Sequence, residues 1–126
     1  MKTCLILLLT FSAVTHAEVF RMVQADKTFL GNITDKEAAA ASDDNDFEEK
    51  HKIENLNVKV GDSIQFINRD EVSHNVSGWV NEKNIFDVKI QAPGATNDRV
   101  IELKTKGEYI IQCAIHPKMK IKLKVE

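Results

Sequence analysis

The sequence predicts an all-β protein in which about eight short strands form either a sandwich or a barrel. Two observations lead to this prediction. Hydrophobic and polar residues alternate with a period of two through most of the chain after Glu18. The alternating segments are short, and glycine, proline and aspartate residues that favour turns separate them. The chain has 126 residues, which is the size of one such domain.

Three of the predicted strands lie in the first half of the chain. Residues 19–29, with the sequence VFRMVQADKTF, form the first of them. In residues 55–60 the alternation places three hydrophobic side chains on one face: Leu56, Val58 and Val60. The dipeptide Gly61-Asp62 then marks a turn, and residues 63–68 continue as the third strand.

Five more strands are predicted in the second half: 72–79, 85–90, 99–104, 108–113 and 119–125. In the second of these, we expect three residues to share the buried face: Phe86, Val88 and Ile90. The last strand alternates without a fault, with these residues predicted inward: Met119, Ile121, Leu123 and Val125. Its lysines are predicted outward, as a solvated face that protects a strand edge or as a docking surface.

Residues 32–54 break the strand pattern and are predicted to be an acidic insertion. Seven acidic residues lie between Asp35 and Glu49. The segment TDKEAAAA begins with Thr34, a residue type that caps helices, and continues with helix-forming residues. It therefore predicts a short helix, and the rest of the insertion is predicted as a solvated acidic loop.

Residues 1–17 have the pattern of a secretory signal peptide. Lys2 gives a positive start, an apolar core follows, and small residues precede Glu18. The apolar core is shorter than the roughly 20 residues that a membrane-spanning helix needs. We therefore expect an exported protein, periplasmic or secreted, whose mature domain comprises residues 18–126 and does not span a membrane.

Charge and composition argue against several classes of function. Without Lys2, the 17 basic residues become 16 against 19 acidic ones, a net charge of −3 for the mature domain. Nucleic-acid binding usually needs a basic domain, so we expect no nucleic-acid partner. No catalytic serine, histidine and aspartate set and no pair of catalytic carboxylates is recognisable, so we predict that the protein is not an enzyme.

Cys113 is the single cysteine of the predicted mature domain, because Cys4 lies in the signal peptide. Exported proteins usually use cysteines in pairs, as disulfides. An unpaired cysteine is therefore either a small buried hydrophobic residue or a metal ligand. The neighbours favour a metal site, because Cys113, His116 and Met119 follow one another at steps of three in CAIHPKM.

The donor types in this segment restrict the metal. A thiolate, an imidazole and a thioether disfavour magnesium and calcium, which prefer oxygen ligands. Two histidines and one cysteine with a distant methionine are the ligands of a blue-copper electron-transfer site. A second histidine is therefore needed, either His51 in the acidic insertion or His74 after a strongly patterned strand. We choose the latter and predict four ligands: His74, Cys113, His116 and Met119.

Two segments together resemble the cupredoxins, and within them the plastocyanin, pseudoazurin and amicyanin group. These are VKVGDSIQFINRDEVSHNV and GEYIIQCAIHPKMKIKLKV. The specific feature is the pair His74-Asn75 followed by the C-x2-H-x2-M motif that Cys113 begins, with 38 residues between His74 and Cys113. The resemblance covers about residues 55–126.

The resemblance implies a Greek-key β-sandwich with one type 1 copper ion that carries single electrons. In it His74 and His116 are nitrogen ligands, Cys113 is the thiolate and Met119 is the long axial ligand. Asn75 is implied to hold the two ligand loops together and to direct hydrogen bonding toward the cysteine sulfur. The implied partners are redox proteins, such as a dehydrogenase as donor and a c-type cytochrome as acceptor, and we expect a monomer.

The sequence also departs from the family. The insertion at 32–54 is absent from compact relatives, and Ala114-Ile115 stands where many relatives have a proline before the loop histidine. Trp79 follows the first histidine closely, and we expect it to pack in the core. The alternative function is a copper storage or delivery module that uses the same ligands without redox cycling.

Overall fold

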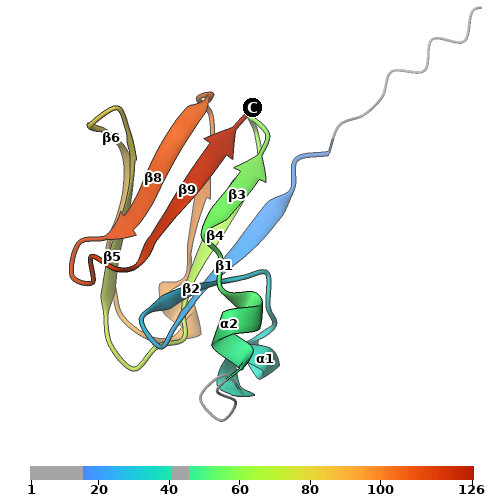
Figure 1. Cartoon of the computed structure of the whole chain (residues 1–126), viewed down its shortest axis with the longest axis vertical. Coiled ribbons are helices and arrows are strands. Elements are labelled where there is room, and N and C mark those ends of the chain that lie inside the picture. Colours follow the sequence, from blue (N-terminus) through green and yellow to red (C-terminus); the bar gives the residue numbers. More distant parts are fainter. Residues whose placement is uncertain (1–15, 41–45) are drawn as a thin grey trace, which may run out of the picture.

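The computed structural model describes residues 16–40 and 46–126. The predicted signal peptide lies outside the described residues except for its last two, so it stays a prediction. Two β-sheets pack against each other in the described part, with two short helices at one end (Figure 1). The helices are α1 (Asp35–Ala40) and α2 (Phe47–His51).

Each sheet draws its strands from distant parts of the chain. The four-stranded sheet has the order β2-β1-β4-β7, with these bounds: β1 Val19–Ala25, β2 Thr28–Gly31, β4 Ser63–Asn68 and β7 Arg99–Glu102. The five-stranded sheet has the order β3-β9-β8-β5-β6, with these bounds: β3 Asn55–Val58, β5 His74–Val80, β6 Lys83–Gln91, β8 Gly107–Cys113 and β9 Lys120–Val125. The β1–β4 and β3–β9 pairs are parallel. This arrangement confirms the predicted β-sandwich.

The first predicted strand is in fact a hairpin of two strands, β1 and β2. The chain reverses at Asp26 and Lys27, whose φ angles of 48° and 54° both lie in the left-handed region. Two such residues in succession form the tight turn that matches the twist of paired strands. The described residues therefore contain nine strands.

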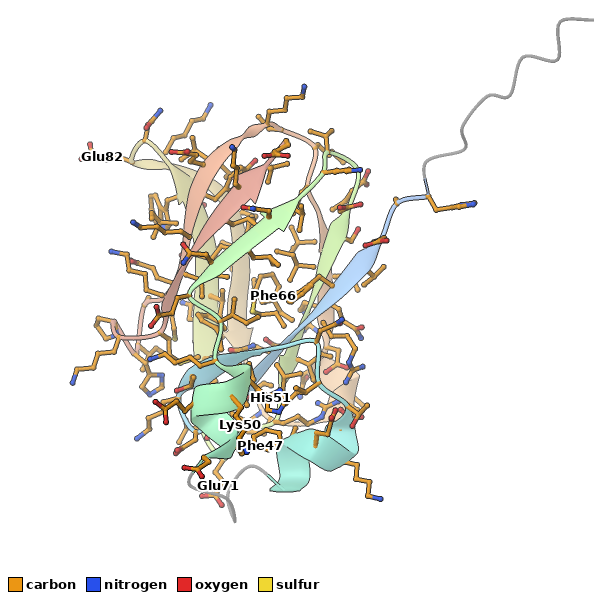
Figure 2. All side chains as sticks on the ribbon, turned by 45° about the vertical axis from the view of Figure 1, so that its right-hand side comes forward. Phe47, Lys50, His51, Phe66, Glu71 and Glu82 are labelled. Carbon is orange, nitrogen blue, oxygen red and sulfur yellow. The ribbon has the colours of Figure 1, made fainter. Side chains whose placement is uncertain are left out.

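The hydrophobic side chains of the alternating pattern fill the space between the two sheets. Phe66 lies in the middle of the sandwich, as Figure 2 shows, and is fully buried. The inward residues predicted for the last strand are also buried: Met119, Ile121, Leu123 and Val125. Burial of each such side chain contributes roughly 1.5–3 kcal/mol to folding.

Three expectations about buried residues are wrong. Ile90 is 68% exposed, because the register of β5 on β6 shifts between Asn75 and Ser77, and Lys89 has a φ of 66°. This bulge turns Gln91 into the interior instead. Val60 lies beyond the end of β3 and is exposed, and Trp79 is 36% exposed rather than packed in the core.

The acidic insertion is more ordered than predicted. As expected, Thr34 caps α1: the N–H of Glu37 donates to its Oγ1 at 3.2 Å, and its own N–H donates to the Glu37 carboxylate at 2.7 Å. Part of the expected loop is the helix α2, whose Phe47 packs on a second hydrophobic cluster with Val23 and Leu30. Figure 2 shows Phe47, Lys50 and His51 on this helix, beneath the sandwich.

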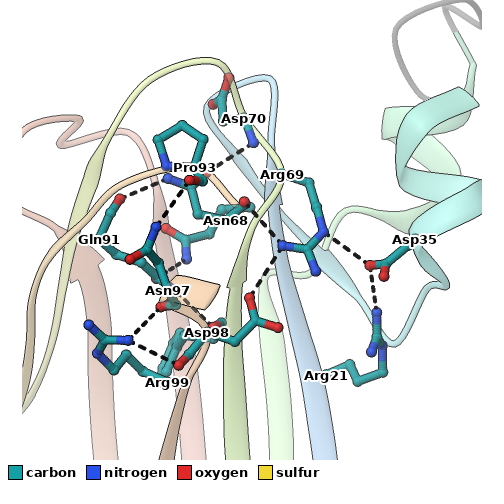
Figure 3. Close-up of polar contacts among 12 residues, drawn as sticks. Arg21, Asp35, Asn68, Arg69, Asp70, Gln91, Pro93, Asn97, Asp98 and Arg99 are labelled. Carbon is teal, nitrogen blue, oxygen red and sulfur yellow. Dashed lines mark hydrogen bonds and ion pairs between the residues drawn. The ribbon is translucent and has the colours of Figure 1, made fainter. Parts of the chain in front are cut away.

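An ion-pair clasp ties the start of α1 to the four-stranded sheet. The carboxylate of Asp35 accepts hydrogen bonds from Arg21 and Arg69, each at 3.1 Å (Figure 3). Arg69 also donates to Asp98 at 3.2 Å. The hydrogen bond from Arg69 is the main cause that holds the pKa of Asp35 below its usual value.

Candidate metal centre

The predicted ligands lie at one end of the five-stranded sheet, where the first residue of β5 lies close to the last residue of its antiparallel neighbour β8. His74 begins β5 and Cys113 ends β8, and the pairing of Val76 with Cys113 brings these ends together. His116 lies in the loop between β8 and β9, and Met119 directly precedes β9. Residues 39 positions apart thus meet because the strands that carry them are neighbours.

Three donor atoms form a small, nearly isosceles triangle. The Sγ of Cys113 lies 3.7 Å from the Nδ1 of His74 and 3.7 Å from the Nδ1 of His116. The two nitrogens are 3.0 Å apart. The point equidistant from these three atoms lies about 2.0 Å from each, close to the roughly 2.0–2.3 Å of zinc–nitrogen and zinc–sulfur bonds. One metal ion with bonds of this length fits between the three atoms without movement of the chain.

Burial differs among the four residues. His74 and Cys113 are fully buried, and Met119 is 2% exposed. Burial lowers the pKa of His74, an effect that outweighs its hydrogen bond to the carboxylate of Asp70, which acts to raise that pKa. The neutral imidazole, which can bind a metal, is therefore favoured. His116 is only half-buried, so it is the ring through which the site approaches solvent.

Backbone hydrogen bonds fix the ligand loop. The N–H of Cys113 donates to the carbonyl of Met119 at 3.1 Å, and the N–H of Met119 donates to that of His116 at 2.9 Å. Met119 also belongs to the same buried cluster as Cys113. The loop is therefore closed on itself, with the thioether-bearing residue held beside the thiol-bearing one.

Asn75 connects the two ligand segments through its backbone. Its N–H donates to the Sγ of Cys113 at 3.3 Å, and its carbonyl accepts the N–H of Ala114 at 2.9 Å. The family resemblance predicts this connection at Asn75 but attributes it to the asparagine side chain. In the structure both contacts come from atoms that every residue except proline possesses.

Asp70 is a residue of the site that sequence reasoning missed. Its Oδ2 lies 2.9 Å from the Nε2 of His74, the ring nitrogen on the side away from Cys113. Burial opposes ionisation of Asp70, but hydrogen bonds from the N–H of Lys27, from His74 and from the N–H of Glu71 keep its pKa below the usual value. An acidic residue four positions before a predicted ligand was the available signal.

His51, the alternative nitrogen ligand, lies elsewhere. It ends α2, where its ring packs on that of Phe47 with 4.4 Å between the centroids. Within residues 16–40 and 46–126, the group of three potential metal ligands from His, Cys, Asp and Glu consists of His74, Cys113 and His116. A thiolate and two imidazoles suit a borderline or soft metal ion, and copper and zinc both accept them.

No helix in the described part of the chain is long and apolar enough to cross a membrane.

Comparison with known proteins identifies the family. Residues 36–126 match the family described as copper binding proteins, plastocyanin/azurin family. The chain is 32% identical over 65 residues to the methylamine utilization protein MauL of Methylophilus methylotrophus, a match that covers 52% of this chain and 37% of that protein. It is 33% identical over 70 residues to the protein of the same name from Methylorubrum extorquens, covering 56% of this chain and 60% of that protein. The chain thus spans about a third to three fifths of these two curated relatives.

Solved structures support the same fold. A methionine-to-alanine variant of amicyanin with Cu(I) superposes with a TM-score of 0.56 at 21% identity, covering 87% of this chain and 82% of that one. A reduced tryptophan-to-tyrosine variant of amicyanin gives a TM-score of 0.50 at 28% identity, covering 60% and 72%. The chain belongs to the plastocyanin/azurin family of copper-binding proteins, the cupredoxins, and its cofactor is a single type 1 copper ion.

Proposed function

We propose that this protein is an exported carrier that shuttles single electrons between redox proteins through a type 1 copper centre. In this proposal the ring nitrogens of His74 and His116 and the thiolate of Cys113 would hold the metal, and the thioether of Met119 would be the weaker fourth donor. The observation that carries it is the triangle of Sγ and two Nδ1 atoms, whose centre is one metal–ligand bond length from each corner.

The chain supplies a rigid, dry site. When bound, copper supplies the one-electron couple between its Cu(II) and Cu(I) states. Little has to rearrange during transfer, because Cys113 and His74 are fully buried at strand ends and the loop is fixed by its own hydrogen bonds. The N–H of Asn75 points at the cysteine sulfur and stabilises its charge.

Electrons would enter and leave at His116. This residue is half-buried, and its loop neighbours Ala114, Ile115 and Pro117 are exposed, with Ile115 at 51%. Apolar side chains around a ligand that reaches the surface favour close, transient contact with another redox protein. The exposed Lys118 and Lys120 beside them give this surface a positive rim.

The partners proposed are a periplasmic dehydrogenase as donor and a c-type cytochrome as acceptor. The names of the two MauL relatives concern methylamine utilization, which is consistent with a donor of that kind. The predicted signal peptide supports a periplasmic or secreted location. We propose a monomeric carrier rather than an enzyme, because a buried metal centre beside exposed apolar residues suits transient contact with another redox protein.

The visible spectrum of the copper-loaded protein tests this function. We expect an intense blue absorption that disappears reversibly on one-electron reduction, and its loss in Cys113→Ala while the fold is retained. A protein that binds only Cu(I) and stays colourless would instead be a storage or delivery module. Thermal unfolding of the metal-free variant serves as the control for folding.

A further inference from the structure

We propose that Asp70 is a positioning residue of the metal centre, which orients His74 and shifts bound copper toward Cu(II). The inference rests on the proposed function, since it concerns the same site. It predicts that the carboxylate lowers the reduction potential of the carrier. The residue lies outside the set of four ligands, and it acts on the metal through the ring of His74.

The two nitrogens of His74 point to different partners. Nε2 lies 2.9 Å from the Oδ2 of Asp70, and Nδ1 lies 3.7 Å from the Sγ of Cys113. An ionised carboxylate only accepts hydrogen bonds, so Nε2 carries the proton and donates it. The lone pair is then on Nδ1, on the side of Cys113 and His116. Asp70 thereby selects the tautomer that can bind metal and the orientation of the ring.

The carboxylate is itself held by backbone donors. The N–H of Lys27, in the β1–β2 turn, donates to Oδ2 at 2.7 Å, and the N–H of Glu71 donates to Oδ1 at 2.8 Å. The side chain of Asp70 is 10% exposed. The carboxylate therefore has a fixed direction, and both of its oxygens are acceptors of backbone N–H groups.

A buried amide, Asn68, spans the loop that carries Asp70. Its Oδ1 accepts the N–H of Asp70 at 3.0 Å. Its Nδ2 donates to the carbonyls of Val72 at 3.0 Å and Gln91 at 2.9 Å. Figure 3 shows Asn68 between Asp70 and Gln91. Because Asn68 is fully buried, this loop has little freedom to move His74.

Gln91 extends the frame across the sandwich. It pairs with His74 in the five-stranded sheet, and its Nε2 donates to the carbonyl of Phe66 in the four-stranded sheet at 2.8 Å. Its Oε1 accepts a hydrogen bond at 2.9 Å from the buried Gln24 of β1. The bulge that exposes Ile90 is what turns this side chain inward. Hydrogen bonds through Gln91 thus fix the position of His74 relative to both sheets.

A neutral acceptor would suffice for a purely structural hydrogen bond to Nε2. A carboxylate costs more to bury, because desolvation opposes its charge. In return, a negatively charged partner makes the histidine a stronger donor to a metal. The more highly charged Cu(II) gains more from that donor than Cu(I) does, so the reduction potential falls.

The experiment compares copper-loaded full-length protein with Asp70→Asn and with Glu71→Gln, a control that removes one charge from the neighbouring residue. For Asp70→Asn we expect Cu(II) affinity to fall by about 10–100-fold and the reduction potential to become more positive. The control should change both much less. Equal changes in both variants would show that only the net charge matters, and would overturn the proposal.

A second measurement needs neither copper nor a variant. Nitrogen NMR of the His74 ring in the metal-free protein should show the proton on Nε2. A proton on Nδ1 instead would refute the orienting role of Asp70. This readout also separates the two proposals: a protein without a blue copper centre would contradict the proposed function, whereas the tautomer of His74 would still decide the role of Asp70.

Discussion

The backbone N–H of Asn75 donates a hydrogen bond to the sulfur of Cys113 at 3.3 Å, across 38 positions of sequence. The same residue accepts the N–H of Ala114 through its carbonyl. The start of β5 and the ligand loop are therefore joined at the metal centre by main-chain atoms. The contribution of the Asn75 main chain can therefore be tested separately from that of its amide side chain.

Asn75→Ala should retain the blue absorption and the reduction potential. The substitution keeps the N–H that donates to sulfur and the carbonyl that accepts from Ala114. Visible spectroscopy and voltammetry of the copper-loaded variant provide the measurement. A large change in either would show that the amide side chain takes part in the site, as the family resemblance implied.

Met119→Leu should keep the fold and change the potential. Met119 is buried in the main hydrophobic cluster, and a volume-conserving replacement there usually costs less than about 1.5 kcal/mol of unfolding free energy. The axial sulfur is lost, so the reduction potential should rise while the blue colour persists. Voltammetry and thermal unfolding measure the two effects. An unchanged potential would exclude Met119 as a ligand.

Ile115→Lys should slow electron self-exchange between copies of the protein by roughly tenfold at low salt. Ile115 is exposed beside His116, so a new positive charge there repels the same charge on the approaching copy. NMR line broadening in mixtures of Cu(I) and Cu(II) protein measures the rate. Val100→Lys, on the four-stranded sheet, is the control because Val100 is also exposed. Equal slowing in both variants would contradict the proposed electron port.

Asp35→Asn should destabilise the protein by less than about 1 kcal/mol at neutral pH, because the carboxylate is 62% exposed. The hydrogen bond from Arg69 lowers the pKa of Asp35 in the folded protein. Its contribution is therefore fully present above the unfolded-state pKa, about 3.9. It disappears as the pH falls through the lower folded-state pKa. Denaturant unfolding at several pH values should show the two proteins converge in acid; a constant difference would contradict the ion-pair clasp.

The sequence predicted most of the fold because strand alternation is a local property. Met119, Ile121, Leu123 and Val125 are buried as the alternation requires. The hairpin at Asp26 and the bulge at Lys89 were not predicted. The hairpin depends on two successive left-handed residues, Asp26 and Lys27, and the bulge on one, Lys89. None of them is glycine or part of a strong turn motif, so the alternation around them does not indicate either feature.

The sequence predicts the parts of the candidate site that depend on the chemical type of the side chains. Cys113 and His74 can be selected by donor type, and the paired strands bring them together. Asp70 could not be selected, because its role depends on how Asn68 folds the loop before His74. The backbone contacts of Asn75 have no sequence signature, since any residue with an N–H could make them.

X-ray absorption at the copper edge tests the central claim most directly, because it reports the atoms bound to the metal. If the triangle of Cys113, His74 and His116 holds the ion, the spectrum of the oxidised protein will show one sulfur and two imidazole nitrogens at about 2.0–2.3 Å. In Cys113→Ser the short sulfur shell will disappear. A wild-type spectrum with only nitrogen and oxygen neighbours at these distances would contradict the account.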